Sequence, residues 1–225
     1  MAKKRTRLVE RRTGQLKGEK ILDISIGSVI YQLFSISNIC KEIHVVQLTN
    51  ASFKHFKQWL ENDKGATDWS YTSKRVCHLE SNRQEWKEKE DQLRKVIKGV
   101  YKWDNHETNS LSSKLVPQVD CVISLYILNV VSKTKDDFLR NLKSFTSTLK
   151  IGGQLLLFMV LNMTFYKVGS HRYFCLTLVE EDVQEVVINA GFIIEKSTLT
   201  KAVEPNDIVN YSHVCYILAR KVKEV

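Results

Sequence analysis

The sequence is poor in proline, and its cysteines follow no recognisable pairing pattern. Two prolines occur among 225 residues, of which 43% are hydrophobic, so the composition is that of a folded globular domain. The five cysteines are odd in number and widely spaced, with no Cys-x-x-Cys or Cys/His ligand spacing. This argues against a disulfide framework or a zinc site and predicts reduced thiols in a cytoplasmic protein.

Long apolar runs are also missing. The longest, LLLFMVL at residues 155–161, is far shorter than the roughly 20 residues that a membrane-spanning helix needs. No apolar segment follows the basic residues at the beginning of the chain, so they do not resemble a secretory signal. The sequence therefore predicts no membrane span, and we expect no membrane partner.

Positive charge is concentrated at the beginning of the chain. The formal net charge is +9, and residues 1–20 carry eight basic and two acidic side chains. That segment holds +6 of the total, which leaves about +3 for the rest. We expect a basic segment at residues 1–18 and a single domain over residues 19–225. If the protein has a nucleic-acid partner, we expect it to bind through residues 1–20. The alternative is that this segment is a solvated end without a specific role.

Apolar runs of strand length alternate with segments of helical periodicity. Strands are expected at Lys20–Ile24, at Glu42–Val46, and in a third segment that ends near Cys77. Further strands are expected at Asp120–Leu125, residues 153–161, Phe192–Leu199 and His213–Arg220. Helices are expected over Ser28–Ser35, Phe53–Leu60, Trp86–Trp103, residues 134–149 and residues 180–190. Nearly continuous apolar strands joined by helices predict an α/β fold with a doubly wound, mostly parallel sheet and an antiparallel edge strand.

Helix boundaries are marked by capping residues and glycines. Thr134 and Asp137 have the spacing of a capping box, and so have Thr177 and Glu180. The first of these helices is expected to stop at the glycines of residues 150–153, where a glycine can take the left-handed conformation. Gly191 is expected to stop the second in the same way.

The turn after the first strand, Asp23-Ile-Ser-Ile-Gly-Ser28, is the first place to look for a ligand. In doubly wound sheets, ligands bind outside the carboxyl ends of the strands, where the strand order reverses. A small-residue turn lets backbone N–H groups approach a ligand at a helix N-terminus. This turn has only one glycine, and neither GxGxxG nor GKS/GKT occurs. A ligand-binding turn and a plain tight turn both fit these residues.

Several segments in one order resemble a known family. They are GEKILDIxxGxxIYQL around Tyr31, KQWLENDKGATDWS, WKEKEDQLRKVIKGVYKWD, DCVISL, LKIGGQLLL, FYKVGSHRYFCL, AGFxIE and ILARK, and the resemblance covers about residues 14–222. The chain resembles the nicotinamide, indolethylamine and phenylethanolamine N-methyltransferases, and is most similar to the first two groups. The resemblance implies a Rossmann-like class I methyltransferase domain, S-adenosylmethionine as cofactor, and a small amine as substrate.

The resemblance also implies a set of cofactor-binding positions, some of which have changed. Tyr31, which packs on the cofactor in the family, and Asp104, which receives the adenine amino group, are kept. Gln47 stands where the family has an acid that binds both ribose hydroxyls, and it lacks the charge that makes that contact strong. The implied cofactor-binding residues are Ser25, Gly27, Tyr31, Gln47, Ser52, Asp104, Asn105 and Leu125.

The turn itself departs from the family's Asp-Ile-Gly-Ser-Gly-Pro-Thr. Ser25 replaces its first glycine and adds a side chain where the backbone approaches the cofactor closely. Ile26 replaces its serine and adds bulk in the same loop. Ser52, Asn105 and Leu125 stand where the family has asparagine, valine and threonine.

The acceptor side has changed as well. Tyr166 is kept, whereas Met159 stands at the position of the aspartate that binds a carboxamide, and Cys175 at that of a serine. The resemblance therefore implies an acceptor site at Met159, Tyr166 and Cys175 that suits a hydrophobic amine. We expect no catalytic acid or base, because methyl transfer to a neutral amine mainly requires alignment and a dry pocket.

Three functions remain open at this point. The first is an active N-methyltransferase of small amines, supported by Tyr31, Asp104 and Tyr166. The second is a degenerate, non-catalytic scaffold with weak or no cofactor binding, supported by Ser25, Gln47 and Met159. It is also suggested by the absence, before the first strand, of the tyrosine-bearing helical segment with which the relatives begin. The third is a nucleic-acid-associated domain that works through residues 1–20. In each case we expect a monomer.

Overall fold

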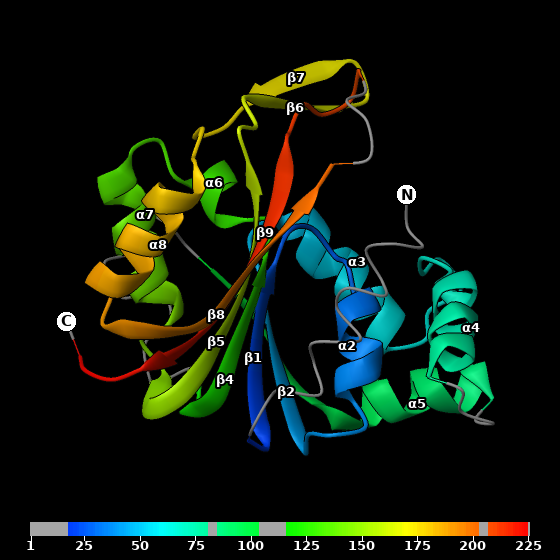
Figure 1. Ribbon diagram of the computed structural model, residues 1–225. Helices are drawn as coiled ribbons and strands as arrows, with labels where there is room; N and C mark the ends of the chain where they lie inside the picture. The colour runs from blue at the N-terminus through cyan, green and yellow to red at the C-terminus, as the bar shows by residue number, and fades with distance from the viewer. Residues whose placement is uncertain (1–17, 81–84, 104–115, 203–206, 225) are drawn as a thin grey trace.

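A seven-stranded sheet forms the centre of the protein (Figure 1). The computed structural model describes residues 18–80, 85–103, 116–202 and 207–224. The strands run in the order β3-β2-β1-β4-β5-β9-β8. Their bounds are β1 Lys20–Ser25, β2 Glu42–Gln47, β3 Ile97–Lys102, β4 Val119–Leu125, β5 Leu149–Leu161, β8 Phe192–Lys201 and β9 His213–Lys221. The basic segment predicted at residues 1–18 lies almost wholly outside the described residues, so its boundary and its nucleic-acid role stay predictions.

The sheet is mostly parallel, as predicted. Strands β3, β2, β1, β4 and β5 pair in parallel, and β9 pairs antiparallel with both β5 and β8. The chain moves outward from β1 through β2 to β3 and then returns to place β4 on the other side of β1. The strand order therefore reverses between β1 and β4, which marks their carboxyl ends as the place for a ligand.

Helices cover both faces of this sheet (Figure 1). One face carries α2 Tyr31–Ile36, α3 Asn50–Leu60, α4 Ser70–Leu79 and α5 Trp86–Val96. The other carries α6 Leu128–Val131, α7 Lys135–Phe145 and α8 Glu180–Asn189. The doubly wound architecture predicted from the sequence is thereby confirmed.

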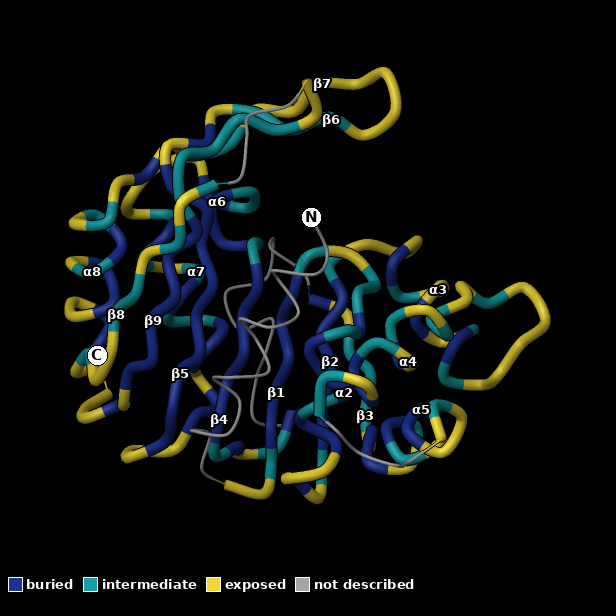
Figure 2. Tube along the Cα trace, turned by 45° about the vertical axis from the view of Figure 1, so that its right-hand side comes forward, coloured by how far each residue is buried: buried dark blue, intermediate teal, exposed yellow. Residues whose placement is uncertain are grey.

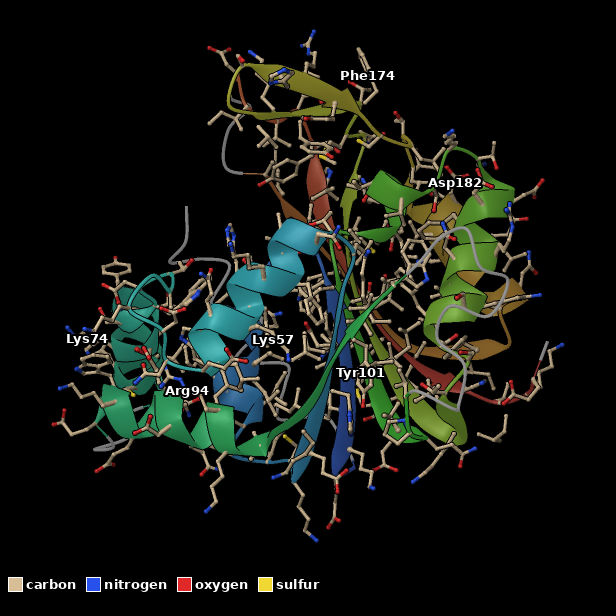
Figure 3. All side chains as sticks on the ribbon, turned by 180° about the vertical axis from the view of Figure 1, so that it is seen from behind. Lys57, Lys74, Arg94, Tyr101, Phe174 and Asp182 are labelled. Atoms are coloured by element: carbon tan, nitrogen blue, oxygen red, sulfur yellow. The ribbon has the colours of Figure 1, made fainter. Side chains whose placement is uncertain are left out.

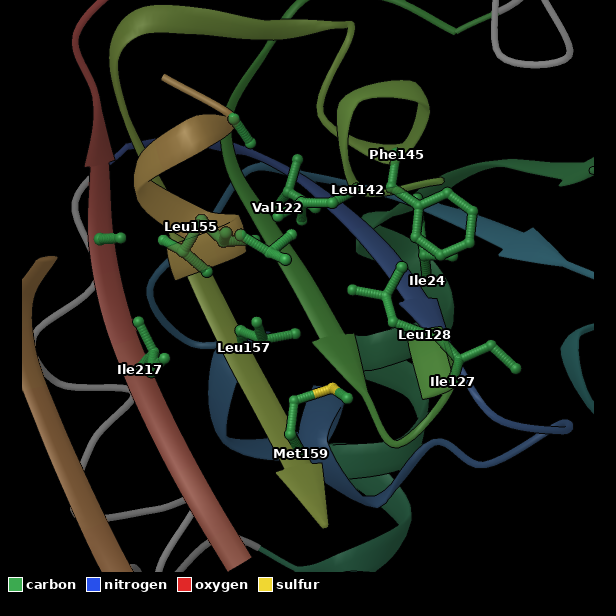
Figure 4. Packing of buried hydrophobic residues seen from close by; sticks show 14 of the residues in the cluster. Ile24, Val122, Ile127, Leu128, Leu142, Phe145, Leu155, Leu157, Met159 and Ile217 are labelled. Atoms are coloured by element: carbon green, nitrogen blue, oxygen red, sulfur yellow. The ribbon is translucent and has the colours of Figure 1, made fainter. Parts of the chain in front are cut away.

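The core consists of two hydrophobic clusters, one on each side of the sheet. Alternate residues of β5 belong to different clusters: Leu155 and Leu157 face α6–α8 (Figure 4), while Leu156 and Phe158 face α2–α5. Figure 2 shows the central strands as the most deeply buried part of the chain. Burial on both faces explains why the strands appear in the sequence as nearly continuous apolar runs.

The third strand is not where the sequence analysis placed it. Residues 70–79, expected to include a strand ending near Cys77, form α4, which buries Ser73, Val76 and Cys77 at helical spacing. The helix predicted over Trp86–Trp103 ends at Val96, and β3 follows. The apolar residues of β3 also suited a helix, but pairing with β2 decides the structure, and Gly99 inside this segment disfavours a helix.

The capping box predicted at the start of α7 is present, but the predicted end of that helix is wrong. The Asp137 N–H donates to Thr134 Oγ1 at 3.1 Å, and the Thr134 N–H donates to the Asp137 carboxylate at 3.1 Å. Helix α7 ends at Phe145 rather than at the glycines of residues 150–153, which lie inside β5. Gly152 does have a positive φ of 84°, but there it bends a strand.

Helix α8 begins differently from the prediction and ends as predicted. The Thr177 hydroxyl donates to the Met163 carbonyl at 3.2 Å and does not cap the helix. Asp182 instead accepts from the Val179 N–H at 3.1 Å. Gly191 follows the helix with a φ of 88°, the left-handed conformation that only glycine adopts without strain.

The hairpin of β6 Phe165–Val168 and β7 His171–Phe174 was not predicted. It lies between β5 and α8 in the chain and projects beyond the carboxyl ends of the central strands (Figure 1). Among the described residues, its two strands pair with each other, and Tyr166 also forms a bridge with Val209.

The described residues also bear on the state of the cysteines, on metal binding and on membrane spans. All five cysteines are free thiols. Over the described ranges, the structure brings no three His, Cys, Asp or Glu side chains together in a way that could hold a metal ion. None of the helices that the structure describes is both long and apolar enough to cross a membrane.

Candidate cofactor and acceptor site

Three predicted cofactor residues meet at the carboxyl edge of the sheet. Ser25 ends β1, Gln47 ends β2 and Leu125 ends β4, and Ser25 and Leu125 are paired in register. The Ile26 N–H donates to the Leu125 carbonyl at 3.0 Å, which holds the start of the turn against β4. The sequence-predicted positions therefore come together at the point where the strand order reverses.

The turn after β1 is not blocked by the serine that replaces a family glycine. The Ser25 side chain is 1% exposed, and its hydroxyl donates to the Asp23 carboxylate at 2.9 Å. It is thus directed inward rather than into the loop. Gly27 has a φ of 63°, and a Cβ built there would meet no atom within 4 Å. The turn therefore has open space at Gly27, which a ligand would need. The next helix, α2, begins at Tyr31.

A buried carboxyl group supports this turn from below. Asp23 is fully buried, and the Gln32 amide nitrogen lies 3.2 Å from both of its oxygens. Burial raises the pKa of Asp23 to about 7, although the hydrogen bonds from Gln32 and Ser25 act in the opposite direction. Asp23 therefore changes protonation state near neutral pH, directly beneath the candidate site.

Gln47 has a side-chain acceptor that the described residues leave unused. The residue is 1% exposed, and its side-chain oxygen has no hydrogen-bond partner among the described residues. A buried polar atom without a partner is costly, so such atoms are often satisfied by a ligand. At the end of β2, this oxygen suits a donor such as a hydroxyl group. The replacement of the family acid thus removes the charge but keeps an acceptor.

Ser52 is engaged in helix capping. Its hydroxyl accepts from the Thr49 N–H at 3.3 Å, and its own N–H donates to the Thr49 hydroxyl at 3.0 Å. These bonds form the capping box of α3, so the position helps to fix the start of that helix beside the strand ends. Asp104 and Asn105 lie outside the described residues, and their adenine contacts stay predictions.

The predicted acceptor residues divide between the two faces of the sheet. Tyr166 and Cys175 both pack against the α2–α5 cluster, and Tyr166 stacks on Tyr173 with ring centroids 5.3 Å apart. Met159 is 1% exposed and packs in the α6–α8 cluster with Ile127 and Leu128 (Figure 4). The structure therefore brings Tyr166 and Cys175 together and leaves Met159 in the core beside α6.

Cys175 is a neutral thiol in this setting. Its sulfur donates to the Met163 carbonyl at 3.5 Å, and burial raises its pKa to about 11. A thiol that stays protonated at neutral pH is a poor nucleophile. Burial, together with Cys175 and Tyr173, also raises the pKa of Tyr166. Both residues can therefore form an uncharged wall.

Sequence analysis missed Asn129. This residue of α6 is fully buried, and both polar atoms of its side chain lack a partner within the part of the chain that the structure describes. Its backbone carbonyl accepts from the Leu176 N–H at 2.9 Å, next to Cys175. In the sequence it lies inside the apolar run YILNVV. The only signal there is a polar amide side chain among apolar ones. Tyr126, just before α6, has a φ of 58°, a conformation that concentrates at functional sites.

Two cavities lie away from this edge. One of about 450 Å³ lies between α3 and α5 and is lined by Trp59, Trp69 and Arg94 among others. There the Arg94 guanidinium lies 4.4 Å from the Trp59 ring centroid and pairs with Glu90 (Figure 3). The other, of about 440 Å³, lies at the amino ends of the strands. Neither includes a sequence-predicted site residue, so we place the candidate site at the strand ends.

Comparison with known proteins identifies a family. A family model described as the NNMT/PNMT/TEMT family matches residues 2–222. The chain is 32% identical to rabbit (Oryctolagus cuniculus) indolethylamine N-methyltransferase over 92% of its own length and 79% of the relative's. It is also 32% identical to human (Homo sapiens) nicotinamide N-methyltransferase, over 92% and 78% of the two chains. Mouse (Mus musculus) phenylethanolamine N-methyltransferase is 33% identical over 82% and 63%.

Solved structures agree on the fold. A SAM-dependent methyltransferase from Methanosarcina mazei has a TM-score of 0.63 at 15% identity, over 94% of this chain and 96% of that one. The glycopeptide N-methyltransferase MtfA, in complex with S-adenosyl-L-methionine, has a TM-score of 0.62 at 12% identity, over 97% and 87%. From the family match and the relatives together, the chain belongs to the NNMT/PNMT/TEMT family and has the Rossmann-like fold of the S-adenosylmethionine-dependent methyltransferases.

Proposed function

We propose that this protein is an S-adenosylmethionine-dependent N-methyltransferase of a small, apolar amine. The proposal is carried by the buried side-chain oxygen of Gln47, which has no hydrogen-bond partner among the described residues. It lies at the strand ends, where the topology predicts a ligand. Membership of a family whose relatives are N-methyltransferases supports it. Neither the comparisons nor the open turn at Gly27 supports the alternative of a non-catalytic scaffold.

The residues at the strand ends fit the cofactor. S-adenosylmethionine supplies a methyl group on a positively charged sulfur, which makes that group an electrophile. Gln47 would accept a hydrogen bond from a ribose hydroxyl, and the turn around Gly27 would offer backbone N–H groups at the start of α2. The Tyr31 ring would pack on the cofactor and Leu125 would provide an apolar wall, while adenine binding by Asp104 and Asn105, outside the described residues, stays a prediction.

The acceptor pocket would hold the amine in its neutral form. Methyl transfer needs the amine lone pair, so an uncharged and dry surrounding favours it. Tyr166 and the protonated Cys175 thiol supply that surrounding, whereas Met159 lies in the core beside α6. Asn129 supplies the polar group that orients the amine N–H, because its buried side chain has no partner within the described residues. No residue has to act as a general base.

The first test is calorimetric titration of the full chain with S-adenosylmethionine and with S-adenosylhomocysteine. We expect micromolar binding of both, followed by transfer of a labelled methyl group to amines screened from indolethylamines outward. A folded protein that binds neither compound would contradict the proposal. Binding without transfer to any amine would support the cofactor assignment and contradict the proposed class of acceptor.

Gln47→Asp should bind the cofactor more tightly than the wild type. A carboxylate accepts from both ribose hydroxyls with charge-assisted bonds, so we expect about a tenfold lower dissociation constant. Calorimetry with S-adenosylhomocysteine measures it. Gln154→Asp is the matched control, since Gln154 is also a buried glutamine but lies in the amino-terminal half of β5, away from the carboxyl ends of the strands. Unchanged affinity of Gln47→Asp would contradict the assignment of the ribose to β2.

Asn129→Leu should slow methyl transfer and leave the fold intact. Leucine has a similar volume and removes two buried polar atoms that lack partners in the described structure, so stability should be unchanged or higher. We expect kcat/KM for the amine to fall roughly tenfold to a hundredfold, because a lost orienting contact misplaces the acceptor. Cofactor affinity should not change. An unaltered kcat/KM would remove Asn129 from the acceptor site.

A further inference from the structure

The β6–β7 hairpin has two chemically different faces. In an antiparallel pair, opposite residues share a face, and the pairs Phe165–Phe174 and Lys167–Arg172 alternate with Tyr166–Tyr173. Tyr166 packs against the α2–α5 cluster, so its face is the inner one. Ile208 lies on the outer side, because its neighbour Val209 pairs with Tyr166 and also packs against that cluster. We call Phe165, Lys167, Arg172, Phe174 and Ile208 the outer hairpin face.

The outer hairpin face combines exposed apolar groups with positive charge. Phe174 is 77% exposed and Ile208 is 61% exposed, and neither belongs to a core cluster. Figure 3 shows Phe174 on the hairpin at the outer limit of the molecule. The Arg172 guanidinium lies 3.7 Å from the Phe165 ring centroid. Residues 165–174 contain no acid, and Asp207 beside Ile208 is the nearest one in the described adjoining segment.

We propose that the outer hairpin face docks on an anionic lipid bilayer. Large apolar side chains gain free energy when they enter the interfacial layer of a bilayer. Lysine and arginine beside them reach lipid phosphates while their aliphatic stems stay with the apolar groups. Phe174 and Ile208 enter the interface, and Lys167 and Arg172 bind the headgroups. This proposal departs from the expectation of no membrane partner, which rested on the lack of a segment long enough to span a bilayer; surface docking needs no such segment.

Charge and shape favour a bilayer over the other possible partners. In a symmetric contact with a second copy, Lys167 and Arg172 would meet the same cations of the other subunit. A peptide partner is usually held in a groove, whereas this hairpin is a projecting ribbon (Figures 1 and 2). Neither of the two cavities described above includes a hairpin residue. An anionic bilayer is deformable and negatively charged, so a projecting, positively charged ribbon can dock on it.

Docking would place the acceptor site beside the membrane. The inner face of the same hairpin carries Tyr166, which the proposed function assigns to the acceptor pocket. An apolar amine dissolved in the bilayer would then have a short path to that pocket. This consequence rests on the proposed function, but membrane docking itself does not.

Vesicle binding tests the proposal directly. The full chain is sedimented with phosphatidylcholine vesicles that contain or lack phosphatidylserine. We expect binding only with phosphatidylserine, and about a tenfold weaker binding for Phe174→Ser/Ile208→Ser. Tyr71→Ser is the matched control, because Tyr71 on α4 is 73% exposed and lies far from the hairpin in sequence. Equal binding of the double variant and the wild type would overturn the proposal.

A second readout separates the hairpin from residues 1–20, whose net charge of +6 by itself attracts anionic surfaces. Phe174→Trp and Tyr71→Trp each add one tryptophan, and brominated lipids quench only a ring that enters the bilayer. We expect additional quenching for Phe174→Trp alone. Equal quenching of the two variants, or binding to a polyglutamate peptide without binding to vesicles, would overturn the proposal. Turnover of a soluble amine should be the same in Phe174→Ser/Ile208→Ser and the wild type, so failed docking and failed catalysis are distinguishable.

Discussion

Asp23→Asn should abolish most of the loss of stability that the wild type shows between about pH 4 and pH 7. In the folded protein, burial raises the pKa of Asp23 from 3.8 to about 7. Between these values the folded state holds a proton that the unfolded state has released, so the free energy of unfolding falls as the pH rises. Above pH 7 both states are ionised and the slope vanishes. The cost at pH 8 is at most about 4 kcal/mol, and asparagine avoids it.

Urea unfolding from pH 4 to pH 8 measures this effect. Asp120→Asn is a suitable control, because Lys150 and the backbone N–H groups of Glu19 and Lys20 lower the pKa of Asp120. Its contribution to stability is present above pH 3.8 and is lost as the pH falls further. From pH 4 to pH 8, Asp120→Asn should therefore lower the stability by a nearly constant amount and keep the wild-type slope, whereas Asp23→Asn should remove most of that slope. A wild-type profile that is flat from pH 4 to pH 7 would show that Asp23 does not retain its proton.

Glu80→Gln should destabilise the protein by about 3 kcal/mol. Lys89 on α5 is fully buried, and its ammonium lies 2.6 Å from the carboxylate of Glu80, which caps the end of α4. Removing the carboxylate leaves a buried positive charge without its counterion, and that desolvation cost is not repaid. Urea unfolding at neutral pH provides the measurement.

The double variant Glu80→Gln/Lys89→Met separates the effect of the unpaired charge on stability from the effect of altered packing. Methionine fills much of the space of the lysine stem without the charge, so we expect it to recover most of the lost stability. Lys89→Met alone should be close to the wild type, which completes a double-mutant cycle. A loss of less than about 1 kcal/mol for Glu80→Gln would mean that water solvates the ammonium.

Much of the sheet could be predicted because its central strands are buried on both faces. The apolar runs of β1, β4 and β5 show this burial in the sequence, and the helices between them fix a parallel arrangement. Strand β3 was missed because its apolar positions suit both a helix and a strand. Only its pairing with β2, which is a long-range contact, decides between them.

The candidate site was predictable in its position but not in its contacts. The turn after β1 was found from the order of the elements and the family resemblance. No pattern in the sequence shows that the Ser25 hydroxyl turns inward to Asp23, or that Gln47 and Asn129 have buried polar atoms without partners in the described structure. Such contacts depend on side-chain directions, which are set by the packed structure.

The position of β9 between β5 and β8 has a consequence for biosynthesis. Strand β8 leaves the ribosome before β9, yet in the described sheet it pairs only with β9. Until β9 inserts, β5 presents an open and strongly apolar edge, and β8 has no partner. Such an intermediate is exposed to wrong pairing with other chains, so chaperone protection should matter most while this last strand is being placed.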